Sequence, residues 1–128
     1  MARKFYFRGK DIEELKKMSL EEFSKLLSSH ERRTLKRMSY RIRKFLEKLR
    51  HAAAKGKVLK THEREMIVIP EMLGMRIRVH QGNGFVDLTI LSEMLGRRLG
   101  EFAFTTKLVK HSGPGVGATR GSKSVDLK

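Results

Sequence analysis

Residues 66 to 90 read MIVIPEMLGMRIRVHQGNGFVDLTI, and this stretch decides the fold of the chain. Its apolar residues first run together over 66–69, which indicates a short buried strand that ends at Pro70. They then alternate with polar residues over 75–80 and again over 85–90. An alternation with a period of two is typical of strands that bury one face. Residues 81–84 read QGNG, which favours a tight hairpin turn because these residues tolerate positive φ. We therefore expect a small antiparallel sheet of about three strands.

A short turn of helix is expected directly after the third strand. Ser92 is its expected N-cap, Met94 and Leu95 lie within the turn, and Gly96 ends it. Glycines recur through this part of the chain at positions that suit turns, and that would also let the backbone approach a phosphate closely. They are Gly74, Gly82, Gly96 and Gly100.

Ahead of the sheet the apolar period changes to that of a helix. Ser19 and Glu22 form the S-x-x-E pattern of a capping box, so a short helix is expected to begin at Ser19. From Arg32 to His51 apolar residues recur at helical spacing, which predicts one long amphipathic helix. These apolar residues are Leu35, Met38, Ile42, Phe45, Leu46 and Leu49.

Together these patterns predict an α+β chain in three parts. Residues 1–58 form a helical basic extension, residues 59–110 a small α+β core, and residues 111–128 a Gly-rich basic tail. Only about 45 residues look like an ordinary packed core, so much of the chain is expected to need a partner to fold against. The tail has no periodic apolar face and is expected to be disordered without RNA. It is either a plain flexible terminus or a segment that tracks RNA, and Arg120, Lys123 and Lys128 favour the second.

Positive charge is concentrated in one segment of the chain. The net charge is +15, of which residues 31–60 carry +10, with twelve Lys or Arg against two Glu, whereas residues 61–106 carry −1. Cations packed this densely along a helix repel one another, and phosphates relieve the repulsion. We therefore expect the partner to be a polyanion.

The candidate nucleic-acid ligands fall into four sets. Those on the long basic helix are Arg32, Arg33, Lys36, Arg37, Arg41, Arg43, Lys44, Lys48 and Arg50. Lys57, Lys60, His62 and Arg64 are expected to clamp the same phosphate backbone, and Arg97, Arg98, Lys107, Lys110 and His111 to bind beside the core. Arg76 and Arg78, with His80, form a strand face that is either solvated or in contact with RNA. Base stacking is not expected to dominate, because the basic segments contain only the aromatic residues Tyr40 and Phe45.

Several other classes of function fit the residues poorly. Cysteine is absent, which excludes disulfides and thiolate metal sites and favours a reducing, cytoplasmic location. The run 117–124 resembles a phosphate-binding loop but has Ser122 where the second glycine is required, and the run 62–66 has Met66 where a zinc-protease helix needs histidine. No enzyme, metal, cofactor or small-molecule substrate is expected, and no stretch approaches the roughly 18 apolar residues of a membrane span.

Two binding alternatives remain for the basic helix. A basic amphipathic helix also suits an anionic membrane or a calmodulin-like groove, although the absence of Trp and the narrow apolar stripe argue against both. An architectural DNA-binding protein is the other alternative, because helix charge alone does not distinguish duplex DNA from folded RNA.

A specific resemblance runs through residues 66–121. The segments IVIPEMLG, QGN, EMLGRRLGEF and HSGPGVGAT occur in this order, with Thr105 between the last two, and they resemble the universal small-subunit ribosomal protein S-nineteen family, called S-fifteen in the older eukaryotic naming. The segment 5–9, the Arg-rich helix and the segment 60–62 look like its archaeal and eukaryotic branch, which carries an N-terminal extension absent from bacteria. Arg97 departs from the histidine of many relatives, and Arg76 with Arg78 lies in a strand that is often less basic.

The resemblance implies a structural role in the ribosome. Its expected partners are the 3′ major domain of small-subunit rRNA in the head of the subunit and the neighbouring S-thirteen family protein. The tail is expected to run toward the decoding region, with tRNA as a further partner. The expected location is the cytoplasm, in the ribosome, and catalysis is not required.

Overall fold

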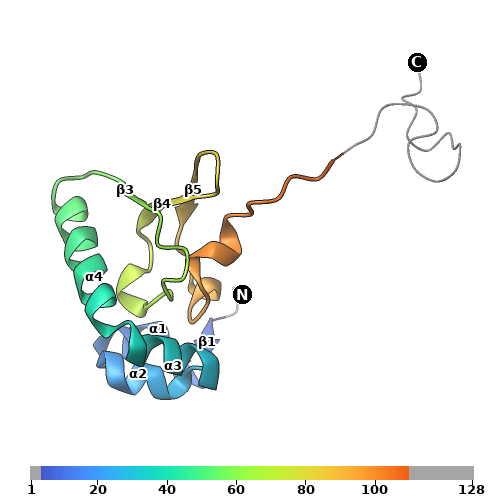
Figure 1. The fold of residues 1–128 in the computed structure, drawn as a ribbon. Helices are drawn as coiled ribbons and strands as arrows, with labels where there is room; N and C mark the ends of the chain where they lie inside the picture. Colours follow the sequence, from blue (N-terminus) through green and yellow to red (C-terminus); the bar gives the residue numbers. More distant parts are fainter. Residues whose placement is uncertain (1–3, 110–128) are drawn as a thin grey trace, which may run out of the picture.

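The computed structural model of the chain describes residues 4 to 109 and has the expected α+β architecture (Figure 1). The tail expected over 111–128 lies outside the described residues. The helices are α1 (Ile12–Lys17), α2 (Leu20–Leu26), α3 (Ser29–Arg37) and α4 (Ser39–Ala54). The strands are β1 (Tyr6–Phe7), β2 (Lys10–Asp11), β3 (Leu59–Thr61), β4 (Arg76–His80) and β5 (Phe85–Thr89), and short 3-10 turns occupy Pro70–Met72, Ser92–Met94 and Leu99–Phe102.

The three-stranded sheet has the order β3-β4-β5 and is mixed in direction. The expected hairpin is confirmed: β4 and β5 are antiparallel, with His80 opposite Phe85 across the turn. β3 instead pairs parallel to β4, with Leu59 opposite Ile77, so the expectation of a wholly antiparallel sheet is wrong. β3 is too short for its alternation to stand out in the sequence.

The segment 66–69, expected as a strand, lies in the core and forms only an isolated bridge, between Ile67 and Arg98. Its backbone groups still find partners, because the Val68 N–H donates to the carbonyl of Arg97 at 2.8 Å and the Leu99 N–H donates to that of Met66 at 2.9 Å. All four side chains of the segment are buried, which explains the unbroken apolar run.

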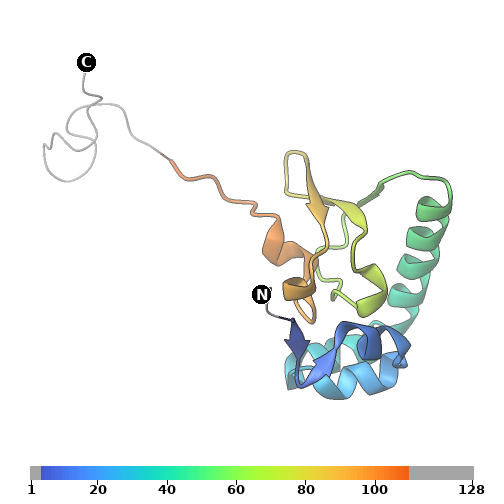
Figure 2. The same cartoon turned by 180° about the vertical axis from the view of Figure 1, so that it is seen from behind.

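The basic helix expected over 32–51 is two helices. Met38, with φ −101° and ψ 17°, interrupts the chain between α3 and α4. α3 lies across the base of the molecule with α1 and α2, whereas α4 rises along one side of the sheet (Figures 1 and 2). A straight helix over 29–54 would be about 39 Å long. The break lets the apolar stripe follow the surface of a much smaller core.

A capping box begins α2, as expected. The Glu22 N–H donates to the hydroxyl of Ser19 at 3.3 Å, and the Ser19 N–H donates to the carboxylate of Glu22 at 3.0 Å. The later turn begins differently, because Leu91 rather than Ser92 is its N-cap. The N–H groups of Met94 and Leu95 donate to backbone carbonyls, so the Ser92 hydroxyl has no orphan donor to cap. Gly96 ends this turn with φ +73°, as expected.

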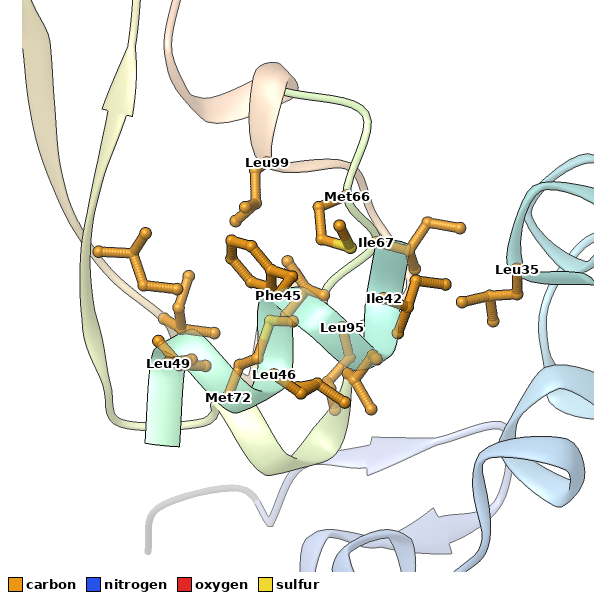
Figure 3. Packing of buried hydrophobic residues seen from close by; sticks show 14 of the residues in the cluster. Leu35, Ile42, Phe45, Leu46, Leu49, Met66, Ile67, Met72, Leu95 and Leu99 are labelled. Atoms are coloured by element: carbon orange, nitrogen blue, oxygen red, sulfur yellow. The ribbon is translucent and has the colours of Figure 1, made fainter. Parts of the chain in front are cut away.

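One hydrophobic core joins the N-terminal helices to the sheet. Leu15 of α1 and Phe23 of α2 are as fully buried as Ile77 and Val79 of β4. Figure 3 shows Phe45 of α4 beneath Leu99 and beside Met66, with Leu35 of α3 facing Ile42 of α4 and Ile42 close to Ile67. The expectation that much of the chain needs a partner to fold against is therefore wrong for the helices described. Within residues 4–109, no helix has the length and apolarity needed to span a membrane.

Candidate nucleic-acid interface

A basic cleft of about 270 Å³ opens between α4 and the segment that contains β3. Arg41, Lys44 and Lys48 are spaced at i, i+3 and i+7, which brings them to one face of α4. Lys60 of β3 and His62 just after it line the opposite wall. The remaining lining residues are Phe45, Leu59, Thr61 and Glu63.

The cleft retains most of its positive charge. Glu63 is the one acidic residue among those lining it, and the guanidinium of Arg41 engages this carboxylate in an exposed ion pair. Exposed pairs of this kind contribute little to stability, about 0–1 kcal/mol. Lys44, Lys48 and Lys60 also line the cleft, and none of them has an acidic partner within 4 Å among residues 4–109.

Further cations extend the basic surface along α3 and α4. Arg33, Lys36, Arg37 and Arg43 are exposed and form no ion pair within the described part of the chain. Arg50 differs, because it donates to the carboxylate of Glu71 at 2.6 Å. This hydrogen bond, and then the charge of Glu71, raise the pKa of Arg50 above its usual value.

The solvent face of the sheet is less positive than its sequence suggests. Arg78 donates to the carboxylate of Asp87 at 2.5 Å, and Arg76 lies 4.0 Å from the same carboxylate. At the far end of this face, the rings of His80 and Phe85 lie together with that of His62. Sequence reasoning missed Phe85, although its position directly across the hairpin turn from His80 is a readable signal.

The family model described as Ribosomal protein S19 matches residues 32–111, more than half of the chain. The chain belongs to this family. The match begins in α3 and takes in α4, the cleft and the whole sheet. S19 proteins are non-enzymatic structural proteins of the small ribosomal subunit that bind rRNA and serve translation in the cytoplasm. The expected family, the expected location and the expectation that the chain is not an enzyme are therefore confirmed.

Within this S19 fold, Arg32 acts internally. Its Nε donates to the carbonyl of Ser24 at 3.1 Å, and its Nη2 donates to those of Lys25 and Leu27, each at 3.0 Å. Carbonyls at the C-terminal end of a helix lack partners within that helix. Arg32 thus caps α2 from α3, and this use of its Nε and Nη2 distinguishes it from its exposed neighbour Arg33.

Arg64 joins three separate parts of the S19 core. Its Nη1 donates to the carbonyl of His80 at 2.5 Å, and its Nη2 donates to those of Gly100 at 2.9 Å and Ala103 at 2.6 Å. The side chain is half-buried. This guanidinium therefore ties the end of β4 to the turn Leu99–Phe102.

Arg98 connects the segment after Gly96 to α3. Its Nη2 lies 2.8 Å from Nδ1 of His30 and donates to the hydroxyl of Thr34 at 3.2 Å. The adjacent Arg97 is exposed and lies 3.8 Å from the carboxylate of Glu101.

The remaining candidates do not share one surface. Lys57 is exposed just after α4, whereas the segment that contains Lys107 leaves the folded part on the side of the sheet away from α4 (Figures 1 and 2). Lys110, His111, Arg120 and Lys123 lie outside the described residues. Within residues 4–109, no group of three or more His, Asp or Glu side chains is arranged to hold a metal ion.

Proposed function

We propose that this S19 protein binds the 3′ major domain of small-subunit rRNA in the head of the subunit, beside the S-thirteen family protein. The observation that carries the proposal is the cleft between α4 and β3, which Lys44, Lys48 and Lys60 line without acidic partners within 4 Å among the described residues. An ammonium group is a compact point charge that suits a phosphate, and folded RNA presents phosphates at close, regular intervals.

The mechanism is electrostatic clamping by a rigid scaffold. The outer cations Arg33, Lys36, Arg37 and Arg43 contact phosphates on one side of the RNA, while the cleft holds the backbone on the other. Arg32 and Arg98 do not contact RNA through the groups already bound internally; they hold α3 in place, which fixes the spacing between the two sets of cations. Specificity then comes from the shape of the folded RNA and the spacing of its phosphates.

We assign the chain to the archaeal and eukaryotic branch of the family. The residues ahead of the family match supply Leu15, Phe23 and Leu27 to the core, which supports an N-terminal extension integral to the fold. We keep the division into an extension over 1–58, a core over 59–110 and a tail over 111–128. The tail runs toward the decoding region and contacts tRNA.

The test of rRNA binding is hydroxyl-radical footprinting on small-subunit rRNA, with duplex DNA and unrelated RNA as competitors. We expect a compact protected patch in the 3′ domain that both competitors leave in place. Log affinity should fall by roughly 0.7 to 0.9 per neutralised phosphate for each log unit of salt. Diffuse protection that the competitors erase would contradict the proposal, and displacement by duplex DNA would favour the architectural alternative.

A pair of double variants locates the contact. Lys44→Ala with Lys48→Ala removes two cleft cations, and Lys16→Ala with Lys17→Ala removes the same charge from the exposed face of α1. We expect the salt slope to fall by roughly 1.4 to 1.8 in the cleft variant only, since two phosphate contacts are lost. An equal decrease of the salt slope in both variants would show that net charge, and not the cleft, governs binding.

A further inference from the structure

Three rings from three segments meet beside the basic cleft. His62 follows β3, His80 ends β4 and Phe85 begins β5. The imidazole rings of His62 and His80 are stacked, with centroids 4.4 Å apart and planes 33° from parallel. Phe85 stands nearly perpendicular to both, with its centroid 5.3 Å from that of His62 and 5.0 Å from that of His80. We call these three residues the ring cluster.

The backbone holds the ring cluster in this geometry. His80 and Phe85 are direct partners in the antiparallel register, and the Gly82 N–H donates to Nδ1 of His80 at 3.2 Å, which fixes the plane of the inner imidazole. The Arg64 N–H donates to the carbonyl of His62 at 2.8 Å. This bond shapes the turn that carries the outer imidazole. The rings are therefore positioned before any partner arrives.

Exposure gives the stack an outer and an inner layer. His62 is exposed and His80 is half-buried, while Phe85 is 38% exposed. His62 also lines the basic cleft together with Lys60, whose Nζ lies 5.6 Å from the centroid of Phe85. The outermost ring of the stack thus adjoins the basic cleft.

We propose that the ring cluster binds the base of an unpaired nucleotide of rRNA, which stacks on His62 as a third layer above His80. The adjoining phosphate lies in the cleft among Lys44, Lys48 and Lys60. Proteins recognise single-stranded RNA through this combination of a stacking surface and nearby cations. Stacking on a ring tolerates any base, so the site selects an unpaired nucleotide and not a particular sequence. This inference rests on the proposed function, since it takes RNA as the partner.

The test separates the base from the phosphates. The probes are a single-stranded adenylate 12-mer and an abasic 12-mer with the same number of phosphates, each titrated with the full chain. We expect the wild type to bind the adenylate RNA about 5- to 150-fold more tightly than the abasic one, the range that corresponds to the loss of one base–aromatic stack. In His62→Ala this preference should disappear, whereas in His62→Tyr it should be retained, because tyrosine restores a stacking ring.

Two controls address charge and folding. The double variant Lys44→Ala with Lys48→Ala should weaken binding of both RNAs by the same factor and keep the preference for adenylate. His51→Ala removes an exposed histidine of α4 and should change neither affinity. Thermal melting by circular dichroism checks that each variant is folded. His62→Ala loses ring contacts with His80 and Phe85, so its melting temperature should fall by a few degrees while the protein stays folded.

Two results would overturn the inference: equal wild-type affinity for the two RNAs, or a preference that survives in His62→Ala. Either result, obtained alongside an intact footprint on small-subunit rRNA, would reject the stacking site and leave the proposed function standing. Loss of the footprint itself, with the adenylate preference retained, would reject the ribosomal site and not the stacking chemistry.

Discussion

Neighbouring residues of like charge do different work in this protein. Arg32 and Arg33 are adjacent, yet Arg32 bonds three carbonyls at the end of α2 while Arg33 faces solvent. Sequence patterns identify both as cations on a helix and go no further, because the partner of Arg32 is a helix end brought near by tertiary folding. The same holds for Arg64, whose acceptors lie 16, 36 and 39 residues away along the chain.

The first prediction compares these two arginines. Arg32→Ala should lower the free energy of unfolding by about 1–2 kcal/mol, since carbonyls lose charged donors but water can partly replace them. Arg33→Ala should stay within about 0.5 kcal/mol of the wild type. Urea denaturation measures both. RNA affinity should show the reverse order, with Arg33→Ala binding RNA more weakly than Arg32→Ala. Equal destabilisation of the two variants would refute an internal role for Arg32.

The second prediction concerns pH and the capping box. The backbone N–H of Ser19, and then its hydroxyl, lower the pKa of Glu22 below its ordinary value of 4.5. A carboxylate whose folded pKa is lowered stabilises the fold above its unfolded pKa, and this contribution is lost as the pH falls through the folded pKa. The melting temperature of the wild type relative to Glu22→Gln should therefore fall as the pH drops from 6 to 3.

The matched control for this pH effect is the neighbouring glutamate. Glu21 uses only its backbone carbonyl, which accepts a hydrogen bond from the Ser24 hydroxyl at 2.6 Å. Glu21→Gln should retain more of the wild-type pH dependence than Glu22→Gln does. If the two variants have the same melting profile between pH 3 and 6, the capping box is not the source.

At the scale of elements, sequence patterns located the parts whose signal is local. The β4–β5 hairpin was predictable because QGNG lies between two alternating runs, and the start of α2 because its capping box is complete within four residues. β3 and the break at Met38 were not predictable, because both are set by the shape of the core. The strand predicted over 66–69 was wrong for the same reason. Burial on all sides produces an unbroken apolar run both in a strand and in an irregular core segment.

The third prediction tests how closely the elements pack at Gly96. Its φ is +73°, and a Cβ there would lie 2.8 Å from Cδ2 of the buried Leu27 and 3.2 Å from Cζ of Phe7. Gly74 has a similar φ of +80° but nothing within 4 Å of such a Cβ. Gly74→Ala should cost about 1–2 kcal/mol from backbone strain alone. Gly96→Ala should cost about 1–3 kcal/mol more, because the core is overpacked as well.

Chemical denaturation of the two alanine variants measures this difference. Gly74→Asn serves as a further control, since asparagine tolerates positive φ better than alanine does. An equal loss of unfolding free energy in both alanine variants would mean that the segment after β5 is held loosely against α2 and β1.

At the scale of the whole molecule, charge sets the balance between the isolated and the bound protein. A net charge of +15 on 128 residues repels itself, and the repulsion is greatest where α3 and α4 carry cations with few acidic neighbours. The core nevertheless holds these helices against the sheet. Salt should therefore act in opposite directions on folding and on binding.

The fourth prediction follows from this opposition. Raising NaCl from about 50 to 500 mM, a range over which the screening length shortens severalfold, should raise the melting temperature of the isolated protein while it weakens rRNA binding. The double variant Lys44→Ala with Lys48→Ala should show a smaller rise. Differential scanning fluorimetry with a neutral dye measures the melting temperatures of the two proteins. A melting temperature that falls with salt in both proteins would show that ion pairs, not repulsion, dominate the surface.

The fifth prediction assigns anchoring in the subunit to the folded part and tRNA contact to the tail. The variant that lacks residues 112–128 keeps every core residue described within residues 4–109, so it should still enter the small subunit, while tRNA-dependent steps are impaired. Sedimentation of purified subunits and a tRNA-binding assay measure the two outcomes. Absence of the shortened protein from the subunits would mean that the tail itself is needed for anchoring.

The hydrogen bonds from Arg64 to residues late in the sequence have a consequence for the synthesis of the protein. Synthesis proceeds from the N-terminus, so the cationic helices leave the ribosome early, whereas the carbonyls of Gly100 and Ala103 that Arg64 binds are added near the end. Leu99, fully buried among these helices and the sheet, also arrives late. A growing chain therefore carries its polycationic segment exposed, beside an unfilled core, until the residues around Gly100 have been added. Non-specific RNA binding and aggregation are therefore most favoured before the last quarter of the chain is synthesised.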